Sequence, residues 1–217
     1  AASDVYKRQA ERAGLPKGIL SILPSTDASE TGKEFCENKK VRKLTFTGST
    51  EVGRVLLGQA AKNVLKCSME LGGNAPFIVF DDADLDDAVQ GAIMCKFRNN
   101  GQTCVCANRI YVQTGVYREF AAKLQKAVSK LKVGDGFDPE TTLGPLIGLN
   151  AVKKVNSHIE DAISKGAEPI YCNTYSEEDG NFIYPTILTG VTKKMKVATE
   201  ETFGPLAPLF EFSTVEE

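Results

Sequence analysis

Helical and strand patterns alternate along the first third of the chain, and this alternation restricts the possible folds more than any other feature. Short apolar runs bounded by Gly or Pro are typical of strands, and longer amphipathic runs are typical of helices. Strands separated by helices of this length form βαβ units with parallel strands. The expected elements are a helix end at 10–16, a strand at 18–24, a helix at 27–38, a strand at 43–48, a helix at 49–64 and a strand at 65–71.

A Gly-Gly interruption with a nearby proline follows, and the pattern then resumes. The aspartates after an apolar strand at 77–80 are well placed to cap the next helix; they are Asp81, Asp82 and Asp84. The later expected elements are a strand at 108–113, a helix at 117–131, a Gly/Pro loop at 131–148 and a helix at 149–167. We therefore expect two α/β domains, at residues 1–71 and 72–217.

The composition of the 217 residues is that of an ordinary globular protein, with 42% hydrophobic and 25% charged residues. A formal net charge of −2 gives no reason to expect a nucleic-acid or anionic-membrane partner. No apolar run approaches the length of a membrane span. We therefore expect neither a nucleic acid nor a membrane as a partner.

The cysteines are scattered along the chain rather than arranged as a disulfide framework, which is typical of short secreted proteins. We therefore expect mostly reduced thiols in the cytoplasm or in an organelle matrix such as that of the mitochondrion, and not a secreted protein. The cysteines are Cys36, Cys67, Cys95, Cys104, Cys106 and Cys172.

The segment "FTGSTEVG" (Phe46–Gly53) places a Gly-Ser-Thr turn between a strand and a helix. The N–H groups and the positive dipole of a helix N-terminus favour a phosphate, and the Ser49 hydroxyl can add a donor. Only Gly48 and Gly53 supply a permissive backbone, so this is not a G-x-G-x-x-G loop. For the segment taken alone, a simple Ser or Thr N-cap on a crossover helix is the favoured interpretation.

Glu70 ends an apolar strand and precedes two glycines in "MELGG". A carboxylate at the mouth of a cleft is partly desolvated, and this environment suits a general base. A strand-end glutamate that faces water is the alternative.

The segment "NNGQTCVCANR" (Asn99–Arg109) contains two cysteines, Cys104 and Cys106, one residue apart. A structural zinc site needs four ligands, and the other cysteines do not have the required spacing, so no metal is expected. The only histidine, His158, is interpreted as a surface residue beside the apolar stripe of its helix. A Cys104 thiolate would then depend on backbone dipoles or bound cations. Two small cysteines packed in a loop remain the alternative.

Two further segments carry candidate binding residues. Arg98, six residues before Cys104, could hold a substrate carboxylate through two hydrogen bonds, or could be an ordinary cation at a helix C-terminus. In "EETFGPLAP", Glu201 could bind ribose hydroxyls and Phe203 could pack against a flat ring. An ordinary loop with a Gly-Pro turn is the alternative here.

Together, the order and spacing of "FTGSTEVG", "MELGGNAP", "FRNNGQTCVCANR", "GPLI" and "EETFGPLAP" closely resemble the aldehyde dehydrogenase superfamily. The resemblance extends from about Ala10 to the C-terminus and implies an α/β fold. The fold that the resemblance implies is part of a Rossmann-like cofactor-binding domain followed by most of an α/β catalytic domain of aldehyde dehydrogenase type. Within the superfamily, two of the motifs are similar to those of the succinate-semialdehyde dehydrogenases.

The resemblance implies a role for each matching residue. Cys104 matches the catalytic nucleophile, Glu70 the general base, and Arg98 an arginine that binds the substrate carboxylate. Cys106 matches a cysteine that can form a redox-switch disulfide with the nucleophile. The residues that match the NAD or NADP site are Thr47, Gly48, Ser49, Gly53, Leu71, Gly72, Glu201 and Phe203.

The implied reaction is oxidation of succinate semialdehyde to succinate through a cysteine thiohemiacetal and a thioester. A related enzyme for glutarate semialdehyde, or a catalytically silent truncated domain, are the alternatives. Members of the family are more than twice as long, so we expect the isolated chain to be inactive. The full-length protein is expected to form a homo-oligomer, a dimer or a tetramer.

Overall fold

A computed structural model describes residues 2–171 and 180–217 of the chain. The chain divides into two compact units, Ala1–Leu71 and Gly72–Glu217, and each is described by itself. The helices that the structure describes are all too short or too polar to cross a membrane.

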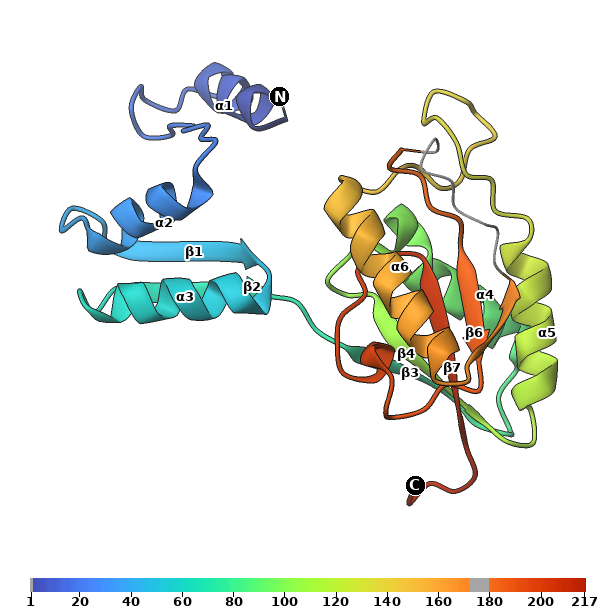
Figure 1. Cartoon of the computed structure of the whole chain (residues 1–217). Helices are drawn as coiled ribbons and strands as arrows, with labels where there is room; N and C mark the ends of the chain where they lie inside the picture. Colours follow the sequence, from blue (N-terminus) through green and yellow to red (C-terminus); the bar gives the residue numbers. More distant parts are fainter. Residues whose placement is uncertain (1, 172–179) are drawn as a thin grey trace. The chain divides into compact units, whose positions relative to one another are not determined.

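The first unit contains a βαβ crossover, as the alternating sequence pattern predicts (Figure 1). Strands β1 and β2 run parallel, and the register pairs Thr47 with Glu70 and Gly48 with Leu71. Cys36, Leu56 and Ala60 are the buried centre of the unit. The elements of this unit are α1 (Ala2–Arg12), α2 (Ala28–Glu37), β1 (Lys43–Gly48), α3 (Thr50–Ala61) and β2 (Lys66–Leu71).

The predicted helix end at 10–16 is confirmed, because α1 ends at Arg12 and Gly14 adopts a left-handed φ of 90°. The predicted strand at 18–24 is wrong. Gly18 has a φ of 88°, and the side chains of Ile19 and Leu23 are 69% and 67% exposed. An apolar segment becomes a strand only when it pairs with a neighbour, and no strand pairs with this one among the described residues.

The second unit is built on a five-stranded sheet with the order β3-β4-β7-β6-β5. All neighbouring strands are parallel except β5 and β6, which are antiparallel. The strands are β3 (Ala75–Val79), β4 (Ala107–Gln113), β5 (Glu168–Tyr171), β6 (Thr186–Thr189) and β7 (Leu206–Phe212), and the helices are α4 (Leu85–Lys96), α5 (Tyr117–Val128), α6 (Leu149–Ser164) and the short 3-10 helices η1 (Arg98–Gly101) and η3 (Lys196–Ala198).

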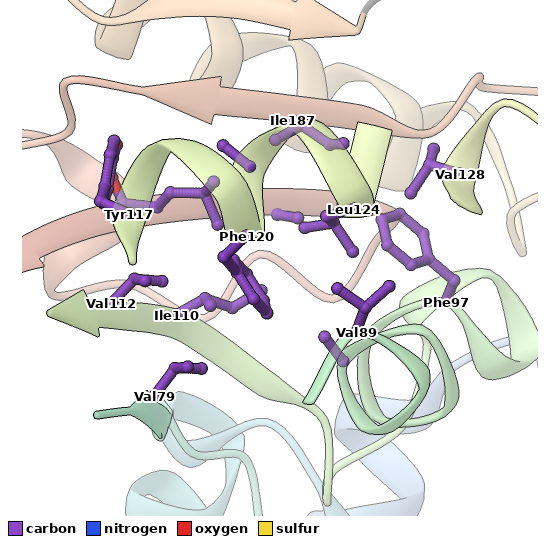
Figure 2. Close-up of a cluster of buried hydrophobic side chains, with 14 of the residues drawn as sticks. Val79, Val89, Phe97, Ile110, Val112, Tyr117, Phe120, Leu124, Val128 and Ile187 are labelled. Atoms are coloured by element: carbon purple, nitrogen blue, oxygen red, sulfur yellow. The ribbon is translucent and has the colours of Figure 1, made fainter. Parts of the chain in front are cut away.

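Helices cover both faces of this sheet. Helices α4 and α5 pack on one face, where Phe120 of α5 lies over Ile110 of β4 (Figure 2). Helix α6 and η3 pack on the other face. Strand β7 contributes to both layers, because Leu209 belongs to the first core and Phe210 to the second. This alternation is the period of two that a pleated strand imposes on its side chains.

Of the three predicted capping aspartates, only Asp84 is the N-cap of α4. Its Oδ1 accepts hydrogen bonds from the N–H groups of Asp86 at 2.9 Å and Asp87 at 3.1 Å. We expect Asp84→Ala to lower the free energy of unfolding by about 1 kcal/mol in urea denaturation. Asp82→Ala is the matched control, because exposed Asp82 caps no helix, and an equal loss in both variants would contradict the assignment.

Candidate active site

The loop between α4 and β4 carries Cys104 and has an unusual backbone. Asn99, Asn100 and Gly101 have consecutive φ values of 52°, 56° and 74°, all in the left-handed region. Asparagine tolerates this region better than most residues, and glycine enters it without a steric penalty. The run of polar and glycine residues before Cys104 therefore allows a turn that other side chains would disfavour.

Contacts with two other segments hold this turn in place. The Asn100 side-chain amide donates to the Gly144 carbonyl at 2.8 Å, and the Ile147 N–H donates to the Gln102 side-chain oxygen at 2.9 Å. On another side, Gly101 lies so close to the Gly204 carbonyl that a Cβ at position 101 would overlap it. The turn is thus fixed by residues that are far away in the sequence.

Cys104 is exposed at the end of this turn. Its backbone N–H makes no hydrogen bond with any of the residues that the structure describes. The thiol is accessible to a small molecule, and an available donor adjoins it. The predicted sharp loop that exposes Cys104 is therefore confirmed, and the alternative of a packed cysteine is wrong for this residue.

Cys106 occupies a different environment, because its side chain is only 1% exposed. Its thiol donates weakly to the Lys96 carbonyl at 3.6 Å, and burial raises the pKa of the Cys106 thiol. The five cysteines within the described ranges all carry free thiols, whereas Cys172 lies outside the described residues. Pairing of Cys104 with Cys106 on oxidation stays a prediction.

Sequence reasoning missed Lys96, whose side chain is completely buried. Its ammonium donates to the Asn108 side-chain oxygen at 3.0 Å and lies beside the Cys106 thiol. Burial lowers the pKa of Lys96, because an ammonium is poorly solvated in the interior. A lysine at the end of a helix normally reaches solvent, so the sequence carries no signal for this burial.

The loop before β7 carries Glu201 and Phe203. The Gly73 N–H donates to the Glu201 carboxylate at 3.4 Å, and a Cβ on Gly72 would overlap the same carboxylate. Phe203 is a non-glycine residue with a φ of 54°, and its ring is partly exposed. The structure therefore brings Gly72 and Glu201 together, although they are distant in sequence.

In the first unit, the candidate cofactor residues gather at the carboxyl ends of β1 and β2. Ser49 is the N-cap of α3, and its hydroxyl accepts a hydrogen bond from the Val52 N–H at 3.3 Å. A Cβ on Gly53 would lie 2.6 Å from Leu71 Cδ2, so glycine permits the close contact of α3 with β2. The helix N-terminus, the strand ends and the Ser49 hydroxyl thus lie at one edge of this unit, which also carries Thr47, Gly48 and Glu70.

Arg98 begins η1 and is exposed. It has no ion pair with a carboxylate in the described part of the chain, so its guanidinium is available to an anionic group. Glu70 belongs to the first unit and Cys104 to the second, and their pairing stays a prediction. Within the described ranges, no group of three or more His, Cys, Asp or Glu side chains could hold a metal ion.

The interpretation of His158 as a surface residue is wrong, because its side chain is 1% exposed. The imidazole Nδ1 lies 3.0 Å from the Thr202 hydroxyl, and Nε2 lies 3.2 Å from the Glu200 carboxylate. The buried stripe of α6 includes Val155, His158 and Ala162, so it is wider than the apolar residues alone indicate. The Glu200 and Thr202 side chains satisfy this polar ring, which explains how it can be buried.

The second unit is a mostly parallel α/β sheet that places an exposed cysteine on a left-handed turn, and the loop of Glu201 packs against this turn through Gly204. The profile of the aldehyde dehydrogenase family matches residues 5–217, and the chain belongs to this family. The comparison confirms the predicted fold class, part of a Rossmann-like cofactor-binding domain followed by most of an α/β catalytic domain.

Similar proteins include several semialdehyde dehydrogenases. The chain is 62% identical to glutarate-semialdehyde dehydrogenase of Pseudomonas putida, covering 94% of the chain and 42% of that protein. It is 60% identical to the NADP-dependent succinate-semialdehyde dehydrogenase GabD of Escherichia coli, covering 93% and 42%. The crystal structure of succinate-semialdehyde dehydrogenase from Burkholderia pseudomallei matches with a TM-score of 0.94 at 58% identity, covering 97% and 43%. The chain therefore spans about two fifths of the length of these relatives.

Proposed function

We propose that the whole protein oxidises a small aldehyde with a carboxylate at its other end, with succinate semialdehyde as the preferred substrate and NAD or NADP as the oxidant. The observation that carries this proposal is the exposed Cys104 thiol, with an available N–H group, on a turn that the left-handed backbone of residues 99–101 makes possible. Membership of the aldehyde dehydrogenase family supports the same conclusion.

Cys104 begins the proposed reaction. Its thiolate attacks the aldehyde carbon, a C–S bond forms, and the carbonyl oxygen becomes an oxyanion. The N–H of Cys104, which has no hydrogen bond to the rest of the described chain, is the available donor for this oxyanion. The fixed turn positions the sulfur and the donor together, so little reorganisation accompanies the attack.

The residues present suit the chemistry of a nicotinamide dinucleotide. An anionic pyrophosphate fits the N-terminus of α3, where Ser49 and Gly48 lie. The Glu201 carboxylate can accept hydrogen bonds from ribose hydroxyls, and the partly exposed Phe203 ring offers an apolar surface. When bound, such a cofactor accepts the hydride that leaves the tetrahedral carbon.

Glu70 is proposed to complete the cycle. After hydride loss the acyl group remains on Cys104 as a thioester, and a general base is needed to activate the hydrolytic water. Glu70 lies at the end of β2, in register with Thr47 of β1. We assign residues 1–71 to the cofactor-binding domain, because they carry the Ser49 turn at the N-terminus of α3. We assign residues 72–217 to the catalytic domain, because they carry Cys104.

The proposed substrate class follows from Arg98 and from the relatives. An exposed guanidinium without a carboxylate partner in the described chain can bind a substrate carboxylate through two hydrogen bonds. The names of the relatives include succinate-semialdehyde, glutarate-semialdehyde and 3-sulfolactaldehyde dehydrogenases. The Pseudomonas relative favours glutarate semialdehyde as the second candidate substrate.

A chimera provides the test of this function. Because the chain spans about two fifths of its relatives, the matching segment of the Escherichia coli protein is replaced by this chain; this protein is called the chimera below. Formation of reduced cofactor is followed by absorbance with each semialdehyde at saturation. A folded chimera without turnover on either aldehyde would favour a catalytically silent domain, and turnover by the isolated chain would refute the expectation that it is inactive.

Peroxide is expected to inactivate the chimera, and dithiothreitol is expected to restore its activity. Oxidation of Cys104 followed by attack of the Cys106 thiol would close a very small disulfide ring, and strain makes such a bond easy to reduce. Cys106→Ala should keep the activity but lose the recovery by dithiothreitol. Full activity of the chimera after peroxide would contradict the proposed switch.

We also propose a homo-oligomer, a dimer or a tetramer, in the cytoplasm or the mitochondrial matrix. Free thiols in the described part of the chain suit a reducing compartment. One relative, from rat, is named as mitochondrial. Light scattering of the full-length protein tests the oligomeric state.

A further inference from the structure

The imidazole of His158 is buried and has a polar partner at each nitrogen, and the proposed reaction leaves it without a role. Its two nitrogens lie 3.0 Å from the Thr202 hydroxyl and 3.2 Å from the Glu200 carboxylate. A carboxylate only accepts hydrogen bonds, so Nε2–H donates to Glu200 and Nδ1 accepts the Thr202 hydroxyl proton. This assignment describes a neutral imidazole with both nitrogens satisfied.

The two partners of His158 flank Glu201, the proposed ligand of the nicotinamide ribose. Phe203 follows with a φ of 54°, a conformation that a bulky residue keeps only when its surroundings hold it. Gly204 then packs so closely on Val155 of α6 that a Cβ would overlap that side chain. Helix α6 therefore holds the segment 200–204 from one side, at two points separated by one helical turn.

The opposite side of the same segment faces the remaining candidate residues of the second unit. The Gly73 N–H donates to the Glu201 carboxylate at 3.4 Å. The Gly204 carbonyl packs against Gly101, three residues before Cys104. A shift of the segment away from α6 would therefore displace both the Glu201 carboxylate and the support of the Cys104 turn.

We propose that His158 is a positioning residue, whose neutral imidazole fixes the segment 200–204 so that Glu201 is presented to the nicotinamide ribose, and whose protonation weakens cofactor binding. The proposal rests on the proposed function, because it takes Glu201 as the ribose ligand. It adds a residue on α6 that touches neither cofactor nor substrate, and it makes cofactor affinity depend on pH.

Protonation disturbs this arrangement at Nδ1. The added proton turns Nδ1 into a donor, so the Thr202 hydroxyl must rotate, and within the described ranges it has no other hydrogen-bond acceptor. Thr202 is buried, so its hydroxyl proton cannot be satisfied by bulk water. The segment then has to move to satisfy both groups.

The charged groups around the imidazole set the sign of the pH dependence. Burial lowers the pKa of His158 most, Glu200 opposes this effect, and Lys154 and Lys196 add to it. The imidazole is therefore neutral at pH 7, and its protonation begins only below its ordinary value of about 6.5. Cofactor affinity should be constant above pH 7 and should fall as the solution becomes acidic.

The test measures the dissociation constant of the oxidised cofactor by calorimetry, at pH 7.5 and pH 5.5, in the chimera. From pH 7.5 to 5.5 the constant should rise about threefold, because only part of the imidazole is protonated at pH 5.5, and His158→Phe should raise the constant about tenfold already at pH 7.5. His158→Gln keeps an amide donor for Glu200 and does not titrate. The cofactor dissociation constant of this variant should therefore change less than about twofold between the two pH values. Thr202→Val should raise the constant about threefold at pH 7.5.

Glu160→Gln is the matched control, because Glu160 lies on the exposed side of α6, and it should behave like the parent. The cofactor KM should rise more than the aldehyde KM in the His158 variants. Circular dichroism checks folding, and His158→Gln and Thr202→Val keep the test decisive if His158→Phe does not fold. Cofactor binding that is independent of pH and of these variants would overturn the proposal while the function stands. A folded chimera that neither binds cofactor nor oxidises aldehyde would instead overturn the proposed function, and the role of His158 with it.

Discussion

Aldehyde oxidation by the chimera is expected to fall by about 10⁴-fold or more when Cys104 is replaced by serine. A serine hydroxyl stays protonated at neutral pH and is a far weaker nucleophile than a thiolate, so the covalent adduct does not form. The rate is followed through the absorbance of the reduced cofactor. Cofactor binding, measured by calorimetry, should be unchanged in Cys104→Ser, because the loss concerns the reaction and not the fold.

Cys95→Ser is the matched control for this experiment. Cys95 lies at the end of α4, and its sulfur accepts a hydrogen bond from the Ala107 N–H at 3.2 Å. A serine oxygen can still accept hydrogen bonds at this position, so the activity should stay within about twofold. Activity of Cys104→Ser within about tenfold of the parent would refute the assignment of the nucleophile.

Gly101→Ala is expected to lower both the stability and the activity of the chimera strongly. Gly101 has a φ of 74°, and an added Cβ would overlap the backbone carbonyl of Gly204. A backbone atom cannot move aside as a flexible side chain can, so the strain must be relieved by displacing the turn or the segment 200–204. We expect a loss of about 3 kcal/mol or more in the free energy of unfolding, and a large loss of activity.

Gly136→Ala is the control for Gly101→Ala. A Cβ on Gly136 has no other atom within 4 Å, and this glycine does not have a positive φ. Its free energy of unfolding should change by less than about 1 kcal/mol. Urea denaturation measures the free energy of unfolding of the two variants in the chimera. A similar loss in both would show that the contact of Gly101 with Gly204 does not contribute to stability.

Local sequence patterns predicted most helices and the strands that precede residue 114. The crossover of β1, α3 and β2 follows from short apolar runs on either side of an amphipathic run, and Asp84 is placed where a cap is needed. Strands β5, β6 and β7 were not predicted. Strand β7 is buried on both faces over most of its length, so it has no alternation of polar and apolar residues. Pro205 just before the strand and Pro208 within it indicate a loop.

Two site features escaped prediction for a related reason. His158 and Lys96 are polar residues on amphipathic helices, where the local pattern places them at the surface or at a helix end. The interior accepts them because Thr202 and Glu200 satisfy His158, and Asn108 binds the Lys96 ammonium. These partners lie on other elements, and no helical periodicity indicates which loop or strand will lie opposite.

The sequence by itself determined the family and the identity of the candidate residues, because residue types in a fixed order and spacing are properties of the chain. It also determined that a turn at Gly101 would expose a cysteine. Only the tertiary structure decided that Gly73 meets Glu201 across 128 residues and that Gly101 meets Gly204. Such contacts depend on how the sheet and α6 bring distant loops together, and this packing is a property of the whole fold that no short segment encodes.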